Sequence, residues 1–251
     1  MQIFLMYHDV YVNSYNESGF LKESTNQYKI KAQEFEKHVK AVAEYCRIDT
    51  NTVVRFTFDD GGKSFATIIA PILEKYGIKG IFFISTKYIG TESFVSFNQL
   101  TDLKNRGHII GSHSDSHTNL ASLMKEDIYE EWRKSIKKLC PFFENEIYAS
   151  IPEGYLNKDV IDTAFQNKIS VLFTSEPTLK IRKKGDMRII GRYVVYEGMT
   201  ADDVMNIISD WKRRQIVKLK WQLINCMKLV LGNKYDAFKS FIYKRVLRGN
   251  I

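Results

Sequence analysis

Short apolar runs alternate with amphipathic segments along the first 210 residues of the chain. Seven runs have the length and the β-branched or aromatic content of strands. We predict these strands at residues 2–6, 53–58, 80–84, 108–112, 147–151, 170–173 and 188–195. Apolar residues recur at helical spacing between them, which predicts helices at 32–46, 64–76, 96–106, 125–139, 159–167 and 201–211. This alternation is typical of parallel β/α units, and about seven parallel strands predict a distorted (β/α) barrel.

Two segments fall outside this alternation. Residues 11–31 are polar and predict a long loop, which we expect to form a rim over a substrate groove. Residues 211–231 interleave apolar residues with Lys and Arg at roughly helical spacing, and residues 235–247 resemble a second basic helix. We therefore predict a barrel domain at 1–210 and a basic amphipathic helical extension at 211–251.

The positive charge of the chain is concentrated in that extension. Residues 211–251 contain eleven Lys or Arg and one acid, whereas the 251-residue chain has a net charge of +8. A basic helix that carries tryptophan can lie on an anionic membrane surface, and packing on the barrel is the alternative. No recognition motif accompanies the charge, so we expect no specific nucleic-acid partner. No apolar run of about 18 residues occurs, so we expect no spanning helix.

The cysteines and the first residues bear on the compartment. Cys46, Cys140 and Cys226 show no paired spacing and predict reduced, buried thiols. The residues from Met1 onward lack the basic, apolar and small-residue regions of a secretory signal. We expect a cytoplasmic protein, with residues 211–251 placing it at the inner face of the membrane.

Candidate chemistry follows two of the predicted strands. Asp59 and Asp60 end the 53–58 run, and consecutive strand side chains point to opposite faces, so one can ligate a metal while the other faces a substrate. His113 and His117 are four residues apart, which brings both imidazoles to one side of a helix or tight turn. Two histidines and a carboxylate form a ligand set for zinc-like metals that leaves coordination positions open.

The motif Thr57-Phe58-Asp59-Asp60-Gly61, followed about fifty residues later by His113-x-x-x-His117, resembles the polysaccharide deacetylase family with the NodB homology domain. The likeness extends over roughly residues 1–200. It implies metal-dependent removal of acetyl groups from N-acetylated sugars of a polysaccharide or lipid-linked glycan, in the synthesis of cell-surface polysaccharide. It also implies that Asp59 is the general base and that Asp60, His113 and His117 bind a divalent ion. Zinc is the expected metal, and cobalt, nickel and manganese are compatible alternatives.

The chain departs from this family in a motif of Arg-x-Pro-aromatic form. The corresponding residues here begin at Ser150 and continue through Pro152 to Glu153. The backbone N–H of Glu153 remains able to point at an oxyanion, because that donor does not depend on the side chain. Arg192 either replaces the missing guanidinium beside Asp59 or is an ordinary surface charge at a strand end.

The family's late histidine, its usual general acid, is also absent, since no histidine follows His117. We expect His8 to take this role, because Tyr7-His8 resembles the early motif of the family branch that acts on poly-N-acetylglucosamine. The alternative for His8 is a histidine at the edge of the core, bonded to a backbone carbonyl. Two other functions stay open: a glycan-binding relative without turnover, and a metal amidase that acts on a non-sugar amide.

Overall fold

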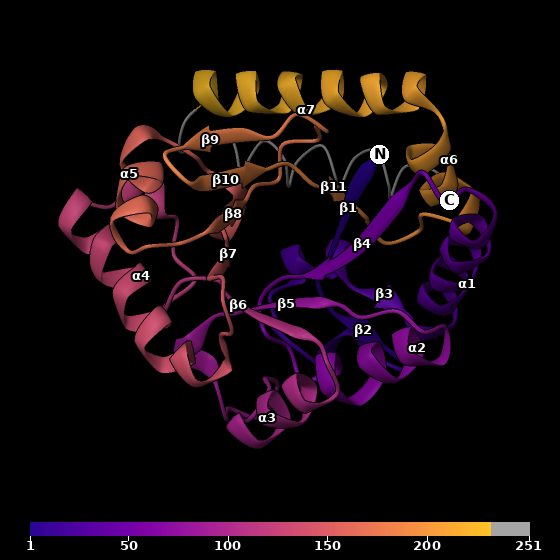
Figure 1. Cartoon of the computed structure of the whole chain (residues 1–251), viewed down its shortest axis with the longest axis horizontal. Helices are drawn as coiled ribbons and strands as arrows, with labels where there is room; N and C mark the ends of the chain where they lie inside the picture. The colour runs from indigo at the N-terminus through magenta and orange to yellow at the C-terminus, as the bar shows by residue number, and fades with distance from the viewer. Residues whose placement is uncertain (232–251) are drawn as a thin grey trace. The chain divides into compact units, whose positions relative to one another are not determined.

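The computed structural model describes residues 1–231, and the chain divides after Asp210 into two units. The first unit is built on a sheet with the strand order β11-β1-β4-β5-β6-β7-β8-β10-β9 (Figure 1). Its strands are β1 (Gln2–Tyr7), β4 (Val53–Phe58), β5 (Ile81–Ile84), β6 (Ile109–Ser112), β7 (Tyr148–Ser150), β8 (Val171–Phe173), β9 (Arg182–Lys184), β10 (Met187–Ile190) and β11 (Tyr193–Val194). A separate pair joins β2 (Val10–Tyr11) to β3 (Ile30–Lys31).

Neighbouring strands of the large sheet run parallel, except that β9 pairs antiparallel with β10. The sheet is curled, and helices cover its outer face (Figure 1). These helices are α1 (Ala32–Ile48), α2 (Ala70–Lys75), α3 (Phe97–Asn105), α4 (Lys125–Leu139), α5 (Lys158–Gln166) and α6 (Ala201–Ser209). The predicted distorted (β/α) barrel is therefore confirmed.

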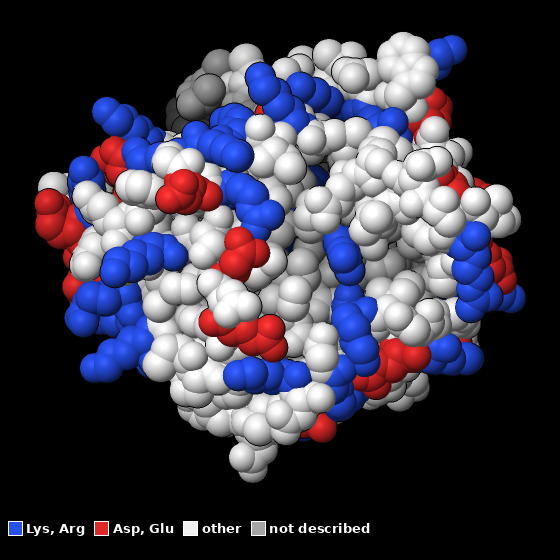
Figure 2. Space-filling view, in the orientation of Figure 1, with Lys and Arg blue, Asp and Glu red and all other residues white. Residues whose placement is uncertain are grey.

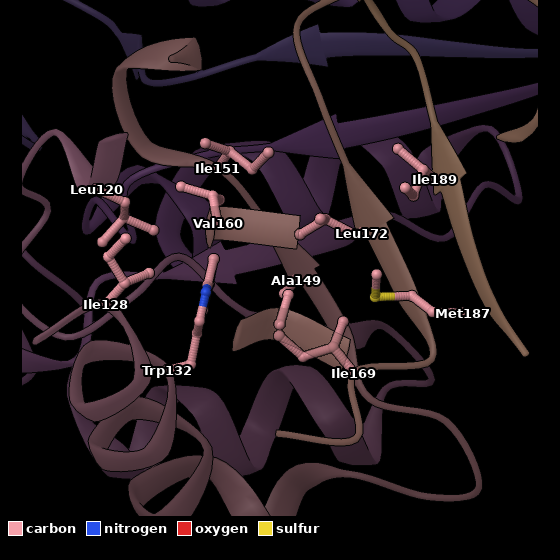
Figure 3. Packing of buried hydrophobic residues seen from close by; sticks show 11 residues of the cluster. Leu120, Ile128, Trp132, Ala149, Ile151, Val160, Ile169, Leu172, Met187 and Ile189 are labelled. Carbon is pink, nitrogen blue, oxygen red and sulfur yellow. The ribbon is translucent and has the colours of Figure 1, made fainter. Parts of the chain in front are cut away.

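Alternate residues of the strands fill two separate apolar layers. On β8, Leu172 points outward and joins a cluster with Trp132 of α4 and Val160 of α5 (Figure 3). Phe173 points inward, where its ring lies 5.1 Å from that of Phe4 and 5.2 Å from that of Phe83. Because consecutive side chains of a strand point to opposite faces, one set fills the interior of the barrel and the other fills the layer under the helices.

The strand predicted at 188–195 is two strands, because the chain changes partners at Gly191. β10 pairs with β8, whereas β11 pairs with β1 at the other end of the strand order. Between them, the backbone N–H of Arg192 donates to the carbonyl of Glu176 at 3.0 Å. A Cβ at Gly191 would lie 2.2 Å from that carbonyl oxygen, so this crossing requires glycine. The crossing carries the Arg192 side chain to a fully buried position.

The second unit, as far as it is described, is the helix α7 (Trp211–Leu231). The predicted second basic helix at 235–247 lies outside the described residues. None of the described helices is both long and apolar enough to cross a membrane.

The three cysteines are free, but Cys46 is only half-buried and Cys140 and Cys226 are exposed, so the prediction of buried thiols was wrong. Figure 2 shows basic and acidic side chains interspersed over one face of the molecule.

Candidate metal and catalytic site

Asp59 and Asp60 directly follow β4 at the mouth of the barrel, and the backbone turns them to different sides. The N–H of Asp59 still donates to the carbonyl of Tyr7, in continuation of the sheet, at 3.0 Å. The next residue is already in the left-handed region, with φ of 87° at Asp60 and 93° at Gly61. A non-glycine residue in that region costs of order 1–3 kcal/mol and is often found at functional sites. The turn separates the two carboxylates, as the sequence predicted.

His113 and His117 lie in the turn that follows β6. Ser114 and His117 both have left-handed backbone conformations, with φ of 60° and 58°, and the two imidazole rings are 5.1 Å apart. The carboxylate of Glu131, from α4, holds this turn: it accepts from the N–H of Asp115 at 3.0 Å and from the N–H of Ser116 at 2.8 Å. The sequence contained no signal for this function of Glu131, because the contact depends on how α4 packs.

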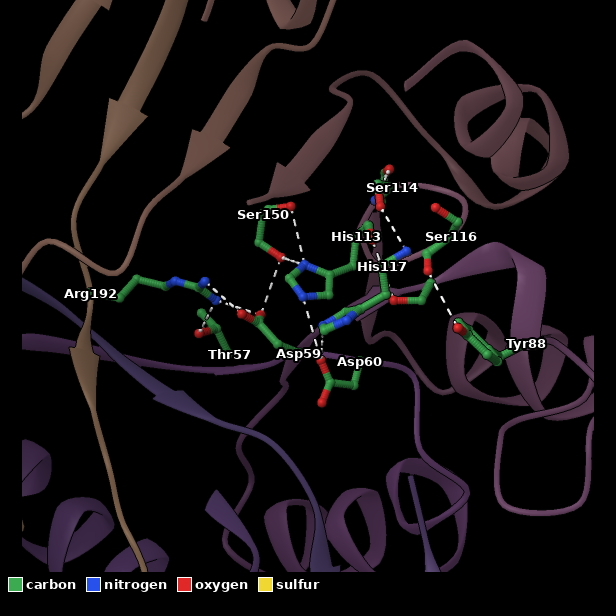
Figure 4. A network of polar contacts seen from close by, with 12 residues as sticks. Thr57, Asp59, Asp60, Tyr88, His113, Ser114, Ser116, His117, Ser150 and Arg192 are labelled. Atoms are coloured by element: carbon green, nitrogen blue, oxygen red, sulfur yellow. Dashed lines mark hydrogen bonds and ion pairs between the residues drawn. The ribbon is translucent and has the colours of Figure 1, made fainter. Parts of the chain in front are cut away.

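The structure brings Asp60, His113 and His117 together, with one potential ligand atom of each within 4.8 Å of the others (Figure 4). Oδ1 of Asp60 lies 3.4 Å from Nε2 of His113 and 3.0 Å from Nε2 of His117. This oxygen is buried and has no aligned hydrogen-bond donor among the described residues. Burial opposes its charge, but His117 beside it holds the pKa of the Asp60 carboxyl well below its usual value.

Ser150 fixes the orientation of the His113 ring. Nδ1 of His113 lies 3.1 Å from the backbone carbonyl of Ser150 and 2.6 Å from its Oγ. A proton on Nδ1 that is donated to this carbonyl leaves the Nε2 lone pair directed at Asp60, as metal-ligating histidines require. A buried carboxylate oxygen without a donor and two imidazole nitrogens beside it fit a divalent metal ion.

Arg192 and Asp59 form a buried, two-pronged ion pair. Nη1 donates to Oδ1 of Asp59 at 2.6 Å, and Nη2 donates to Oδ2 at 2.7 Å (Figure 4). Nη1 also donates to Oγ1 of Thr57 at 3.1 Å, and the guanidinium lies 5.4 Å from the centre of the Phe83 ring. Arg192 is therefore not a surface charge, and the structure places it beside Asp59. Burial opposes the charge of Asp59, but the pKa of its carboxyl is lowered because the guanidinium of Arg192 adjoins it.

At the motif where the family carries arginine, the structure places Ser150 between two site residues. Its Oγ donates to Oδ1 of Asp59 at 3.2 Å and also contacts His113. Glu153 lies nearby in the Pro152–Gly154 turn, with a left-handed conformation (φ 56°, ψ −2°) and an exposed side chain. The use of its backbone N–H for an oxyanion stays a prediction.

His8 follows β1, and its ring lies 4.6 Å from the ring of Tyr28. Its Nδ1 is buried and has no hydrogen-bond partner among the described residues. This atom therefore does not make the bond to a backbone carbonyl that was the alternative for His8. Burial lowers the pKa of His8, and the nearby carboxylates of Asp60 and Asp59 act in the opposite direction.

Residues 11–31 lie next to these groups and contribute aromatic rings. The Phe20 ring is 4.6 Å from the His117 ring, and Tyr28 lies beside His8 and 5.5 Å from Tyr196. Asp9 anchors the segment through its Oδ1, which accepts from Oγ of Ser18 at 2.5 Å. The sequence predicted a rim here but did not single out its aromatic residues.

Comparison with known proteins adds independent information. Residues 47–172 match the family model described as polysaccharide deacetylase. The chain is 26% identical over 215 residues to YxkH of Bacillus subtilis (strain 168), provisionally named a polysaccharide deacetylase, covering 78% of this chain and 72% of YxkH. It is 32% identical over 111 residues to the peptidoglycan-N-acetylglucosamine deacetylase of Bacillus cereus, covering 41% of this chain and 38% of that protein. The fold resembles that of the Streptococcus pyogenes deacetylase PplD, solved in complex with acetate, with a TM-score of 0.67, 18% identity and coverage of 83% and 98%.

Proposed function

The chain belongs to the polysaccharide deacetylase family, and from this premise we propose that it removes acetyl groups from N-acetylated sugars in a metal-dependent hydrolysis. The substrate in this proposal is a polysaccharide or lipid-linked glycan of the cell surface. One observation carries the proposal: a buried carboxylate, Asp59, is paired with Arg192 beside a set of potential metal ligands, Asp60, His113 and His117.

Asp60, His113 and His117 would hold a divalent ion, with zinc as the first choice and cobalt, nickel or manganese as alternatives. When bound, such an ion supplies Lewis-acid polarisation of the amide carbonyl and lowers the pKa of water towards neutrality. The ring orientation that Ser150 gives His113 prepares the Nε2 lone pair for this use.

Asp59 is the general base in this proposal. Its carboxylate is ionised because Arg192 stabilises the charge, and it accepts the proton of the attacking water. The two-pronged pair with Arg192 and the hydrogen bond from Ser150 fix the direction of the carboxylate. Arg192 acts through Asp59 and is a positioning residue.

The remaining steps need an oxyanion donor and a proton for the leaving nitrogen. The backbone N–H of Glu153 is the proposed donor to the developing oxyanion. His8 is the proposed acid that protonates the nitrogen, so that an amine and acetate leave the site. We include a cytoplasmic location in the proposal, because the three cysteines are free thiols as expected in a reducing compartment.

Release of acetate from N-acetylglucosamine oligomers tests this function. We expect release by the zinc-loaded protein, loss of release after chelation, and recovery when zinc is returned. Oligomers that bind without losing acetate would instead support the glycan-binding relative. Release of acetate only from simple acetamides would support the metal amidase.

A further inference from the structure

Helix α7 exposes a stripe of apolar side chains. Ile216, Leu219, Leu223 and Met227 are spaced three, four and four residues apart, which places them on one face of the helix. Their exposed fractions are 45%, 58%, 66% and 37%. By contrast, the apolar residues Val204, Ile207 and Ile208 of α6 are buried. A run of large apolar side chains left in water on one helix face indicates a surface that another body covers.

Positive charge borders the stripe. Lys212 lies one turn before Ile216 and Lys220 one turn after it, and both lysines are exposed. The described helix contains no Asp or Glu, and Trp211 at its start is 61% exposed. The whole segment 211–251 carries a charge of +10 from eleven basic residues and one acid. The body that covers the stripe must therefore be apolar at its centre and negatively charged around it.

We propose that α7 docks on the surface of an anionic membrane, with its axis along the membrane plane and the stripe inserted among the acyl chains. Lys and Arg side chains near an anionic leaflet are attracted to its surface, and lysine stems reach from the apolar level up to the headgroups. A second copy of the chain is a poor alternative, because it would bring two segments of charge +10 together. Nucleic acid would satisfy the charge and leave the apolar stripe uncovered.

Docking of α7 on a membrane does not depend on the proposed activity. It gives that activity a setting, because a membrane-bound enzyme meets glycans that are attached to lipid carriers. Binding and turnover can be measured separately, so that either idea can fail without the other.

Flotation of the full-length protein with vesicles tests the docking. We expect binding to vesicles of phosphatidylcholine mixed with phosphatidylglycerol, weak binding to phosphatidylcholine alone, and binding that declines as salt rises. Absence of binding to the mixed vesicles, or equal binding to both compositions, would overturn the proposal.

Two matched double variants separate insertion from simple charge attraction. The leucine variant combines Leu219→Glu with Leu223→Glu, and the glutamine variant combines Gln215→Glu with Gln222→Glu. Each variant adds two negative charges to exposed positions of the same helix. The leucine variant additionally removes two inserted side chains, so we expect it to lose roughly tenfold more affinity for mixed vesicles than the glutamine variant. Circular dichroism and acetate release from soluble oligomers should be unchanged in both variants.

Equal losses in the two variants would contradict insertion of the stripe. Light scattering tests the alternative of a second copy. If the wild-type chain does not bind vesicles and forms a dimer that dissociates only in the leucine variant, the stripe is a dimer interface. Binding to a DNA duplex in place of vesicles would also overturn the membrane proposal.

Discussion

The largest stabilising contribution to the charge of Asp59 comes from Arg192, which lies 133 positions later in the chain. Both side chains are fully or almost fully buried, at 0% and 1% exposed. A buried charge without a partner is strongly unfavourable, whereas the intact pair contributes little net stability. The pair is therefore best understood as a means of keeping one carboxylate ionised and oriented inside the barrel mouth.

Replacement of Arg192 by Gln should lower the free energy of unfolding by about 3–5 kcal/mol, because it leaves Asp59 buried without a cation. Addition of Asp59→Asn to this variant should recover part of the loss, since the unpaired charge is then removed. Urea unfolding of the wild type, both single variants and the double variant measures this coupling. Losses that simply add would show that the two residues do not interact.

Arg188→Gln is the matched control for that experiment. Arg188 lies on β10, close in sequence to Arg192, and pairs with Glu146 at 2.6 Å, but its side chain is 39% exposed. An exposed pair contributes about 0–1 kcal/mol, so this variant should unfold almost like the wild type.

His8→Ala tests the proposed acid. General acid–base catalysis contributes about 10²- to 10⁴-fold, so kcat for acetate release should fall by that amount. The metal content should not change, because His8 is not among the proposed ligands. Turnover close to that of the wild type would remove His8 from the mechanism.

At the scale of elements, Glu74 connects α2 to the short segment between α3 and β6. Its carboxylate accepts from Nε of Arg106 at 3.0 Å and lies 2.9 Å from Nε2 of His108. These partners lower the pKa of Glu74 to about 2, with Arg106 as the largest contribution. His108 in turn accepts from the N–H of Gly80 at 3.0 Å and so ties this pair to the start of β5.

The lowered pKa gives stability a defined pH dependence. The folded state holds Glu74 ionised more strongly than the unfolded chain does, so this contribution is present above pH 4.5 and is lost as pH falls towards 2. Its upper limit is about 3 kcal/mol, reduced by solvent because 27% of the side chain is exposed. Glu74→Gln should therefore be less stable than the wild type at pH 7, and the difference should shrink towards pH 2 in urea unfolding. A difference that stays constant over this range would contradict the assignment.

The pattern of apolar residues predicted several elements well. The strand at 53–58 and the helix at 125–139 were predicted with the bounds that the structure gives. The break at Gly191 was not predicted, because it arises from a change of strand partners and from a carbonyl of Glu176 that only the folded chain brings close. The strand β9, with the sequence Arg-Lys-Lys, was missed because it lacks apolar alternation.

For the site too, the sequence predicted some residues, and only the folded chain shows the others. The spacing of His113 and His117 and the position of Asp60 after a strand indicated the residues that the structure brings together. For Arg192, the sequence left two alternatives open, and only the course of the chain between β10 and β11 decides between them. Contacts made by Glu131 and Phe20 depend on tertiary packing and leave no local pattern.

At the scale of the whole molecule, chemistry and charge reside in separate segments. The residues that we assign to catalysis lie within 1–210, where basic and acidic residues nearly balance, and the excess of positive charge lies in 211–251. We expect the first segment to carry the hydrolysis and the second to decide where the protein works.

In the proposed mechanism, a divalent ion held by Asp60, His113 and His117 works with a separate base, Asp59. The most direct measurement is metal content together with acetate release for the wild type, Asp59→Asn and Asp60→Asn, with circular dichroism to confirm folding. We expect Asp59→Asn to retain the ion and lose turnover, and Asp60→Asn to lose both. Near-normal turnover in Asp59→Asn, or undiminished metal content in Asp60→Asn, would contradict this mechanism.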